Sequence, residues 1–143
     1  MEPGTYLQKR REAAGLAIDD VARMMAPASP HARGRVAADL TAIERGGALD
    51  PRLALGLVEE LRTIFRFDPT VYHALAAHAV DPDSELPLPN VCRLCGCSWN
   101  DPCEDPDRGP CAWADAEQDL CTRCLQAAAV AAAAIAPAPG AGR

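Results

Sequence analysis

Hydrophobic residues recur at helical spacing in the first 80 residues of the chain. Residues 51–65 show this pattern clearly, because one face of such a helix collects Leu53, Leu57, Leu61, Ile64 and Phe65. Residues 69–79 repeat the arrangement with Val71, Leu75 and Ala79. No stretch before residue 80 carries the pattern of a strand, so the first half is predicted to be helical.

Capping residues and glycines set the bounds of the predicted helices. Asp50 and Asp68 each precede a proline, an arrangement that places a capping carboxylate before proline at the first helical position. Thr5 is the expected cap of the first helix, and Gly15 stands where a residue just past a helix end is expected. The third helix is expected to stop at Gly46. The predicted helices span residues 5–14, 18–25, 35–45, 51–65 and 69–79.

Two polar stretches rich in proline divide the chain. Residues 26–34 (APASPHARG) predict a loop between the second and third helices, and residues 81–90 (DPDSELPLPN) predict a linker. The expected fold class is mainly α, with a five-helix bundle followed by a small cysteine-rich unit that ends in a helix. The expected units are a helical domain at 1–80, the linker at 81–90, the cysteine-rich unit at 91–136 and a disordered tail at 137–143.

Charge is unevenly distributed along the chain. The net charge of −6 arises within residues 81–143, which hold four Lys/Arg against ten Asp/Glu, whereas residues 1–80 hold ten of each. Residues 5–46 carry seven basic and five acidic side chains, so any contact with nucleic acid must come from this local patch. The chain starts without an apolar signal region, and its longest apolar run is too short to span a bilayer. A cytoplasmic protein without membrane contact is therefore expected.

The stretch from Tyr6 to Ala22 (YLQKRREAAGLAIDDVA) resembles the helix-turn-helix domain of the Cro/phage-repressor type. In that family a third helix ends in the phrase I-E-x-G, and Ile43 to Gly46 match it here. The resemblance covers residues 4–79 and rests on Leu7, Arg11, Ala14 to Leu16, Val21, Ala22, Leu40 and Ile43 to Gly46. It implies a DNA-binding regulator of transcription whose partner is double-stranded DNA.

Basic side chains along these helices are the candidate DNA contacts. Arg33 and Arg35, near the start of the predicted third helix, are the best placed to reach DNA, and Thr41 lies further along the same helix. Phosphate contacts, which position a protein without specifying sequence, are predicted for Lys9, Arg10, Arg23 and Arg45.

Several features depart from the family pattern. The loop at 26–34 replaces the tight turn between the second and third helices, and Ile18 stands where many relatives carry a polar DNA-contacting side chain. A solvated Arg-rich helical surface is the plain alternative. A further alternative is an adaptor in which a degenerate helix-turn-helix and the cysteine-rich unit both bind protein. The acidic second half also suits a homodimer contact or a protein partner.

Seven cysteines lie between residues 92 and 124. Cys92-x2-Cys95 and Cys121-x2-Cys124 have the spacing with which two thiolates occupy adjacent corners of a tetrahedral zinc site. Gly96 lets the chain turn sharply beside the metal. Asp119 is the expected cap of a helix that carries the second pair in its first turn and continues to about residue 136. The sequence therefore predicts structural zinc held by Cys92, Cys95, Cys121 and Cys124.

The three inner cysteines, Cys97, Cys103 and Cys111, leave several interpretations open. They are candidate ligands of a second metal, with a shared thiolate or another group as the fourth ligand. They also fit an iron–sulfur cluster, because iron too is bound by cysteine alone. The simplest alternative is small thiol side chains or an oxidation-prone pair. Trp99 and Trp113 are expected to pack against the metal-binding turn.

The phrases C-R-x-C-G-C, P-C-x-W and D-L-C-x-x-C resemble the cysteine-rich tail of small bacterial and phage-derived proteins that carry a repressor-like helix-turn-helix. This resemblance implies regulation rather than catalysis. The sequence contains no Gly-rich phosphate loop, no H-E-x-x-H and no nucleophile elbow, and a closed four-cysteine site has no open position for substrate. We therefore do not expect an enzyme.

Overall fold

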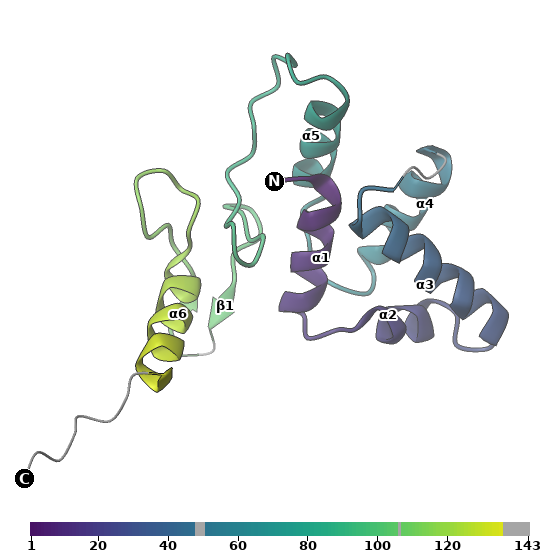
Figure 1. The fold of residues 1–143 in the computed structure, drawn as a ribbon, viewed down its shortest axis with the longest axis horizontal. Coiled ribbons are helices and arrows are strands. Elements are labelled where there is room, and N and C mark those ends of the chain that lie inside the picture. Colours follow the sequence, from purple (N-terminus) through teal and green to yellow (C-terminus); the bar gives the residue numbers. More distant parts are fainter. Residues whose placement is uncertain (48–50, 106, 136–143) are drawn as a thin grey trace, which may run out of the picture.

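The computed structural model describes residues 1–47, 51–105 and 107–135, and within them the chain is mainly α-helical (Figure 1). The first half contains α1 (Pro3–Ala13), α2 (Ile18–Met25), α3 (Pro30–Glu44), α4 (Pro51–Leu61) and α5 (Pro69–Val80). The second half contains two short antiparallel strands, β1 (Glu104–Asp105) and β2 (Gly109–Pro110), and α6 (Thr122–Ile135). In the described part of the chain no helix has the length and apolar character needed to cross a membrane.

Two helices, α2 and α5, lie close to their predicted bounds. The predicted bounds of α2 agree with the structure, and α5 begins after Asp68, whose Oδ1 accepts a hydrogen bond from the Thr70 N–H at 2.8 Å. Gly15 follows α1 with a φ of +73°. There the Leu16 N–H donates to the Arg11 carbonyl at 3.2 Å, which satisfies a carbonyl at the helix end.

The prediction for α3 was wrong at its start. The helix begins at Pro30 rather than at residue 35, so the loop predicted at 26–34 is reduced to residues 26–29. Ser29 caps the helix, because its side-chain oxygen accepts the Ala32 N–H at 3.2 Å, and Pro30 occupies the first helical position. The proline and serine that indicated a loop therefore start the helix instead.

Two other helices differ from their predicted bounds. α1 begins at Pro3, before the predicted cap Thr5, and its N-cap Glu2 makes no side-chain capping bond. α4 ends at Leu61 rather than near Phe65, because the chain tightens into turns in which both Ile64 and Phe65 donate to the Leu61 carbonyl. The predicted cap Asp50 and the predicted tail at 137–143 lie outside the described residues.

One hydrophobic core joins the helices of the first half. Gly4 shows how closely α1 approaches the end of α3, because a Cβ at this position would lie 2.2 Å from the Ile43 carbonyl oxygen. The buried members of the core come from α1 to α5 and from the connection between α4 and α5; they are Tyr6, Leu7, Val21, Leu40, Ile43, Val58, Leu61, Phe65, Phe67, Val71 and Leu75.

The two halves of the chain are in contact. Figure 1 shows the segment after α5 returning alongside α1, with α6 at the other edge of the cysteine-rich segment. Lys9 of α1 donates from Nζ to the Leu94 carbonyl at 3.2 Å. Gly96, with a φ of +73°, lies so close to α1 that an added Cβ would come within 3.4 Å of Tyr6, Lys9 and Arg10 side-chain atoms. The turn that carries Cys92, Cys95 and Cys97 therefore packs against α1.

Candidate metal centre

The first cysteine pair lies in a tight turn closed by backbone hydrogen bonds. The Gly96 N–H donates to the Cys92 carbonyl and the Cys92 N–H to the Cys97 carbonyl, both at 2.8 Å. Gly96 takes the left-handed conformation that this turn requires, as the sequence predicted. Cys95 and Cys97 on either side of it consequently point their sulfurs toward the same cluster.

The other cysteines come to this cluster from three further positions. The Cys111 N–H donates to the Cys103 carbonyl at 2.9 Å, so these two residues flank the small β1–β2 hairpin. Cys121 pairs with Trp113 in an isolated bridge, and Cys124 lies in the first turn of α6. α6 starts at Thr122, so Asp119 is not its cap; the Asp119 carbonyl instead accepts the Arg93 N–H at 2.8 Å.

The sulfurs lie close enough together to hold a metal ion. Cys92, Cys95, Cys121 and Cys124, the four predicted zinc ligands, form one set in which all Sγ atoms lie within 4.8 Å of one another. A second set with the same property consists of Cys95, Cys97, Cys103 and Cys121. All seven cysteines are unpaired thiols.

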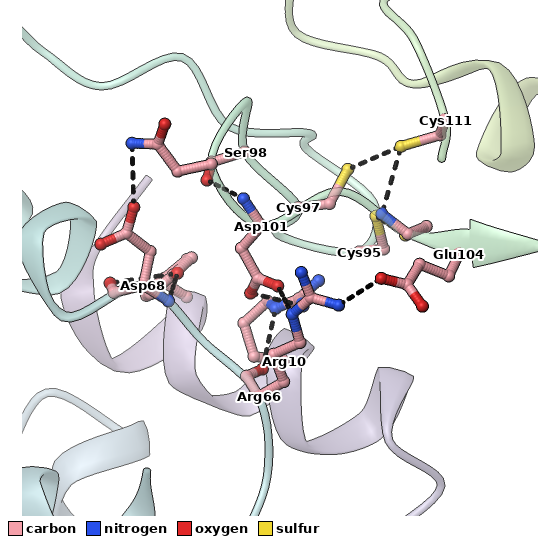
Figure 2. Close-up of polar contacts among 12 residues, drawn as sticks. Arg10, Arg66, Asp68, Cys95, Cys97, Ser98, Asp101, Glu104 and Cys111 are labelled. Atoms are coloured by element: carbon pink, nitrogen blue, oxygen red, sulfur yellow. Dashed lines mark hydrogen bonds and ion pairs between the residues drawn. The ribbon is translucent and has the colours of Figure 1, made fainter. Parts of the chain in front are cut away.

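The second set differs from the one the sequence suggested. Cys97, Cys103 and Cys111 were grouped as candidates for a second metal, whereas the structure groups Cys97 and Cys103 with Cys95 and Cys121. Cys111 remains adjacent, with its Sγ 3.7 Å from that of Cys97 (Figure 2). No spacing in the sequence signals that Cys95 and Cys121 belong to both sets.

The thiols differ in pKa because they hydrogen-bond to one another at close range. Hydrogen bonds from Cys95 and Cys97 lower the pKa of Cys92 well below its usual range. The pKa values of Cys95 and Cys97 are raised, chiefly by their contact with Cys103. Burial raises the pKa of Cys124 to about 12. Some sulfurs therefore favour the thiolate while their neighbours keep protons, and a bound cation would stabilise all of them as thiolates.

Asp101 connects the cluster to the helical half. Its Oδ2 lies 2.6 Å from Arg10 Nη2 of α1, and its Oδ1 lies 2.6 Å from Arg66 Nε (Figure 2). Arg66 also contacts Glu104 Oε1 at 2.6 Å. Burial raises the pKa of Asp101 even though both guanidinium groups favour its carboxylate. Nothing in the sequence signals this pairing, because the acidic and basic residues lie far apart along the chain.

Contacts with the second half change the assignment of two predicted phosphate contacts. Arg10 is only 6% exposed and is engaged by Asp101, so it has no free surface for phosphate, and Lys9 is directed to Leu94. Burying an arginine is favourable only when it is paired, which explains why α1 turns this basic pair toward the acidic second half. We assign both residues to the contact between the halves.

The remaining candidate DNA contacts lie on α2 and α3. Arg35 and Arg45 are exposed, Arg23 forms an ion pair with Asp20, and Arg33 is half-buried with no hydrogen-bond partner at Nε. Thr41 donates its hydroxyl to the Ala37 carbonyl at 2.7 Å. An open cavity of ≈ 280 Å³ lies between the two helices, with Arg23 and Arg33 in its lining.

Arg11 and Glu44 have a structural role. Arg11 Nε and Nη2 each donate to a different oxygen of Glu44 at 2.7 Å, and both side chains are buried. This two-point pair ties α1 to the end of α3. The side-chain hydrogen bond and the charge of Glu44 raise the pKa of Arg11.

The two tryptophans occupy different environments. Trp113 is half-buried against the cysteine cluster, as expected. Trp99 is 78% exposed and lies at a cavity of ≈ 290 Å³ that Cys97, Pro110 and Trp113 also line.

Comparison with known proteins gives no match to a protein-family model, to a curated protein or to a solved structure.

Proposed function

We propose that this chain is a DNA-binding regulator of transcription whose cysteine-rich segment is held by zinc. The observation that carries the DNA-binding part is the connection of four residues, 26–29, between α2 and α3. A turn of three to four residues between two packed helices is the hallmark of the helix-turn-helix, in which the second helix reads the major groove. α2 and α3 pack against each other, with Val21 and Leu40 in the same core.

The proposed reading surface is the N-terminal half of α3. His31 and Arg35 are exposed one turn apart on the same face, whereas Arg33 lies on another face and lines the cavity toward α2. Arginine donates two hydrogen bonds to a guanine edge, so Arg35 is assigned to a base contact. Arg23 and Arg45 are assigned to phosphate, whereas Lys9 and Arg10 are excluded from this surface by their contacts with the second half.

Zinc is favoured at the cysteine cluster by the type of donor. The ligands available there are thiolates alone, and a tetrahedral set of four sulfurs suits zinc or iron–sulfur clusters. The set Cys92, Cys95, Cys121 and Cys124 is closed by protein ligands, which is typical of structural rather than catalytic zinc. Its contact with α1 supports a role in holding the two halves together.

Duplex titration tests this function. The zinc-loaded full chain is titrated with mixed-sequence duplex at increasing salt, and affinity is expected to fall with a log–log slope of about −0.9 for each phosphate contacted. Arg35→Glu is expected to weaken binding about tenfold or more. Arg62→Glu, an equal charge change at an exposed position in the turn just after α4, is the matched control and should bind nearly as the wild type does. Absence of binding at low salt contradicts the proposal.

A second candidate function is a protein-interaction adaptor. Trp99 favours it, because a large aromatic side chain 78% exposed beside a cavity is typical of a surface that contacts another protein. The same titration separates the two candidates. An adaptor would bind a protein partner without salt-dependent affinity for duplex.

A further inference from the structure

Six of the seven sulfurs form two sets of four that share two members. The outer set contains Cys92 and Cys124, the inner set contains Cys97 and Cys103, and both contain Cys95 and Cys121. Two tetrahedra that share two corners share an edge, so together they need six ligands instead of eight. The overlap therefore supplies the number of thiolates that a two-metal cluster with two bridging sulfurs requires.

We propose that the cluster holds two zinc ions bridged by the thiolates of Cys95 and Cys121. This inference rests on the zinc site of the proposed function and adds a second ion to it. Cys92 and Cys124 are the terminal ligands of the first ion, and Cys97 and Cys103 are those of the second. Each ion then has two terminal and two bridging sulfurs.

The sulfur spacing agrees with a shared edge. Zinc–sulfur bonds of about 2.3 Å place adjacent corners of a tetrahedral site about 3.8 Å apart. Cys95 Sγ lies 3.9 Å from Cys121 Sγ, which is the proposed shared edge, and 3.4 Å from Cys103 Sγ in the inner set. Two zinc ions can therefore contact this pair of sulfurs from opposite sides.

One ion alone would leave buried sulfurs without a metal. An ion in the outer set leaves two neighbouring thiols without a metal, those of Cys97, which is 1% exposed, and Cys103. An ion in the inner set leaves Cys92, which is fully buried, and Cys124. Only the two-ion arrangement gives all four terminal sulfurs a metal partner.

The surroundings suit the charge of such a cluster. Six thiolates and two divalent ions leave about two negative charges, which require nearby donors or cations. The Cys121 N–H donates to Cys92 Sγ at 3.4 Å, and Arg10 and Arg123 line the same cavity as Cys103. These groups stabilise sulfur-centred negative charge at both ends of the cluster.

Cys111 is assigned a supporting role. Its Sγ accepts the Cys103 N–H at 3.2 Å and lies 3.7 Å from Cys97 Sγ, but it belongs to neither set of four. It therefore contacts both terminal ligands of the second ion without being needed as a ligand. The proposal therefore differs from a second site built from Cys97, Cys103 and Cys111, in which Cys111 would be a ligand.

The test is metal stoichiometry by native mass spectrometry of the full chain, purified reduced and loaded with zinc. The wild type and Cys111→Ser are expected to carry two zinc ions, and Cys97→Ser one. A single ion in the wild type, or loss of one in Cys111→Ser, overturns the two-ion assignment and leaves the proposed structural zinc intact. A chain with no zinc, or with iron and acid-labile sulfide, contradicts the zinc site as well. These zinc stoichiometries do not depend on whether the chain binds duplex DNA.

Bridging is tested by replacing zinc with cobalt(II). Two high-spin cobalt ions that share thiolates couple magnetically, so the paramagnetic resonance signal per cobalt should fall at least about twofold as the second ion binds. Cys97→Ser, with one ion, provides the uncoupled reference. If the paramagnetic resonance signal per cobalt in the wild type stays the same when the second ion binds, the bridged arrangement is overturned. Helix content from far-ultraviolet circular dichroism shows that the helical half of each variant is folded, because α1 to α5 carry no ligand.

Discussion

Arg10 and Asp101 form an ion pair between the two halves of the chain, with Arg10 Nη2 2.6 Å from Asp101 Oδ2. Both residues are buried, since Arg10 is 6% exposed and Asp101 is 4% exposed. Asp101 lies between Cys97 and Cys103, the proposed terminal ligands of the second ion. The loop that presents the carboxylate to α1 is thus the loop that the metal would hold. Metal binding is therefore expected to stabilise the contact between the halves through this loop.

Asp101→Ala is expected to lower the free energy of unfolding by about 3–5 kcal/mol, because it leaves the buried Arg10 without its carboxylate partner. Arg10→Ala is expected to cost less, because Asp101 keeps its contact with Arg66 at 2.6 Å. The measurement is urea-induced unfolding of the zinc-loaded chain. The double variant should lose less than the sum of the two single losses, since the pair is then removed together. Arg62→Ala, at an exposed position in the turn just after α4, should change stability by no more than about 0.5 kcal/mol. Strict additivity of the two single losses would contradict the pairing.

Glu44→Ala is expected to destabilise the helical half by about 3–5 kcal/mol, because Arg11 would keep a buried charge without its two-point partner. Zinc stoichiometry should stay unchanged, since Glu44 lies at the end of α3 and outside the cysteine cluster. Glu12→Ala is the matched control: Glu12 is exposed, lies 3.9 Å from Arg11, and should contribute less than about 1 kcal/mol. Equal losses for the two variants would refute the structural role of Glu44.

Removal of metal by a chelator is expected to disorder the cysteine-rich segment while α1 to α5 persist. The helical half has its own hydrophobic core, whereas the second cluster consists mainly of cysteines. Trp99 and Trp113 are the only tryptophans of the chain, so their fluorescence reports on the second half alone. Trp113 emission should shift to longer wavelength, with most of the helical circular dichroism retained. Complete loss of helix on chelation would mean that the first half depends on metal.

Local sequence signals predicted part of this fold and non-local contacts supplied the rest. α2 and α5 were predicted closely because their caps and hydrophobic spacing lie within the helix itself. The start of α3 was missed because Ser29 and Pro30 occur in loops as well as at helix starts. The corrected start shortens the connection between α2 and α3 to residues 26–29.

The candidate site was predictable only where spacing in the chain implies proximity in space. The pairs Cys92/Cys95 and Cys121/Cys124 have such spacing, and the structure brings all four sulfurs together. Cys95 and Cys121 belong to both sets of four sulfurs, and this depends on how the β1–β2 hairpin packs against the turn at residues 92–97. The pairing of Arg10 with Asp101 depends on the packing of the two halves, and no local pattern encodes either relationship.

Asp68 is expected to make stability depend on acid pH. Burial alone would raise its pKa, but hydrogen bonds from the Thr70 hydroxyl at 2.6 Å, from the Thr70 N–H and from Asn100 hold the pKa below the ordinary value of 3.8. The folded state therefore binds fewer protons than the unfolded state between these two pKa values. The contribution of Asp68 is complete above about pH 4 and is lost as the pH falls through the folded pKa.

Asp68→Asn is the test, because asparagine still caps a helix but cannot ionise. We expect the variant to be less stable than the wild type by about 0.5–1 kcal/mol above pH 5, as measured by urea unfolding. The difference should shrink toward zero as the pH falls below the folded pKa. Metal release in acid lowers the stability of both proteins alike, so the difference between them isolates Asp68. A difference that stays constant down to pH 2 would show that the Asp68 carboxylate makes no charge-dependent contribution.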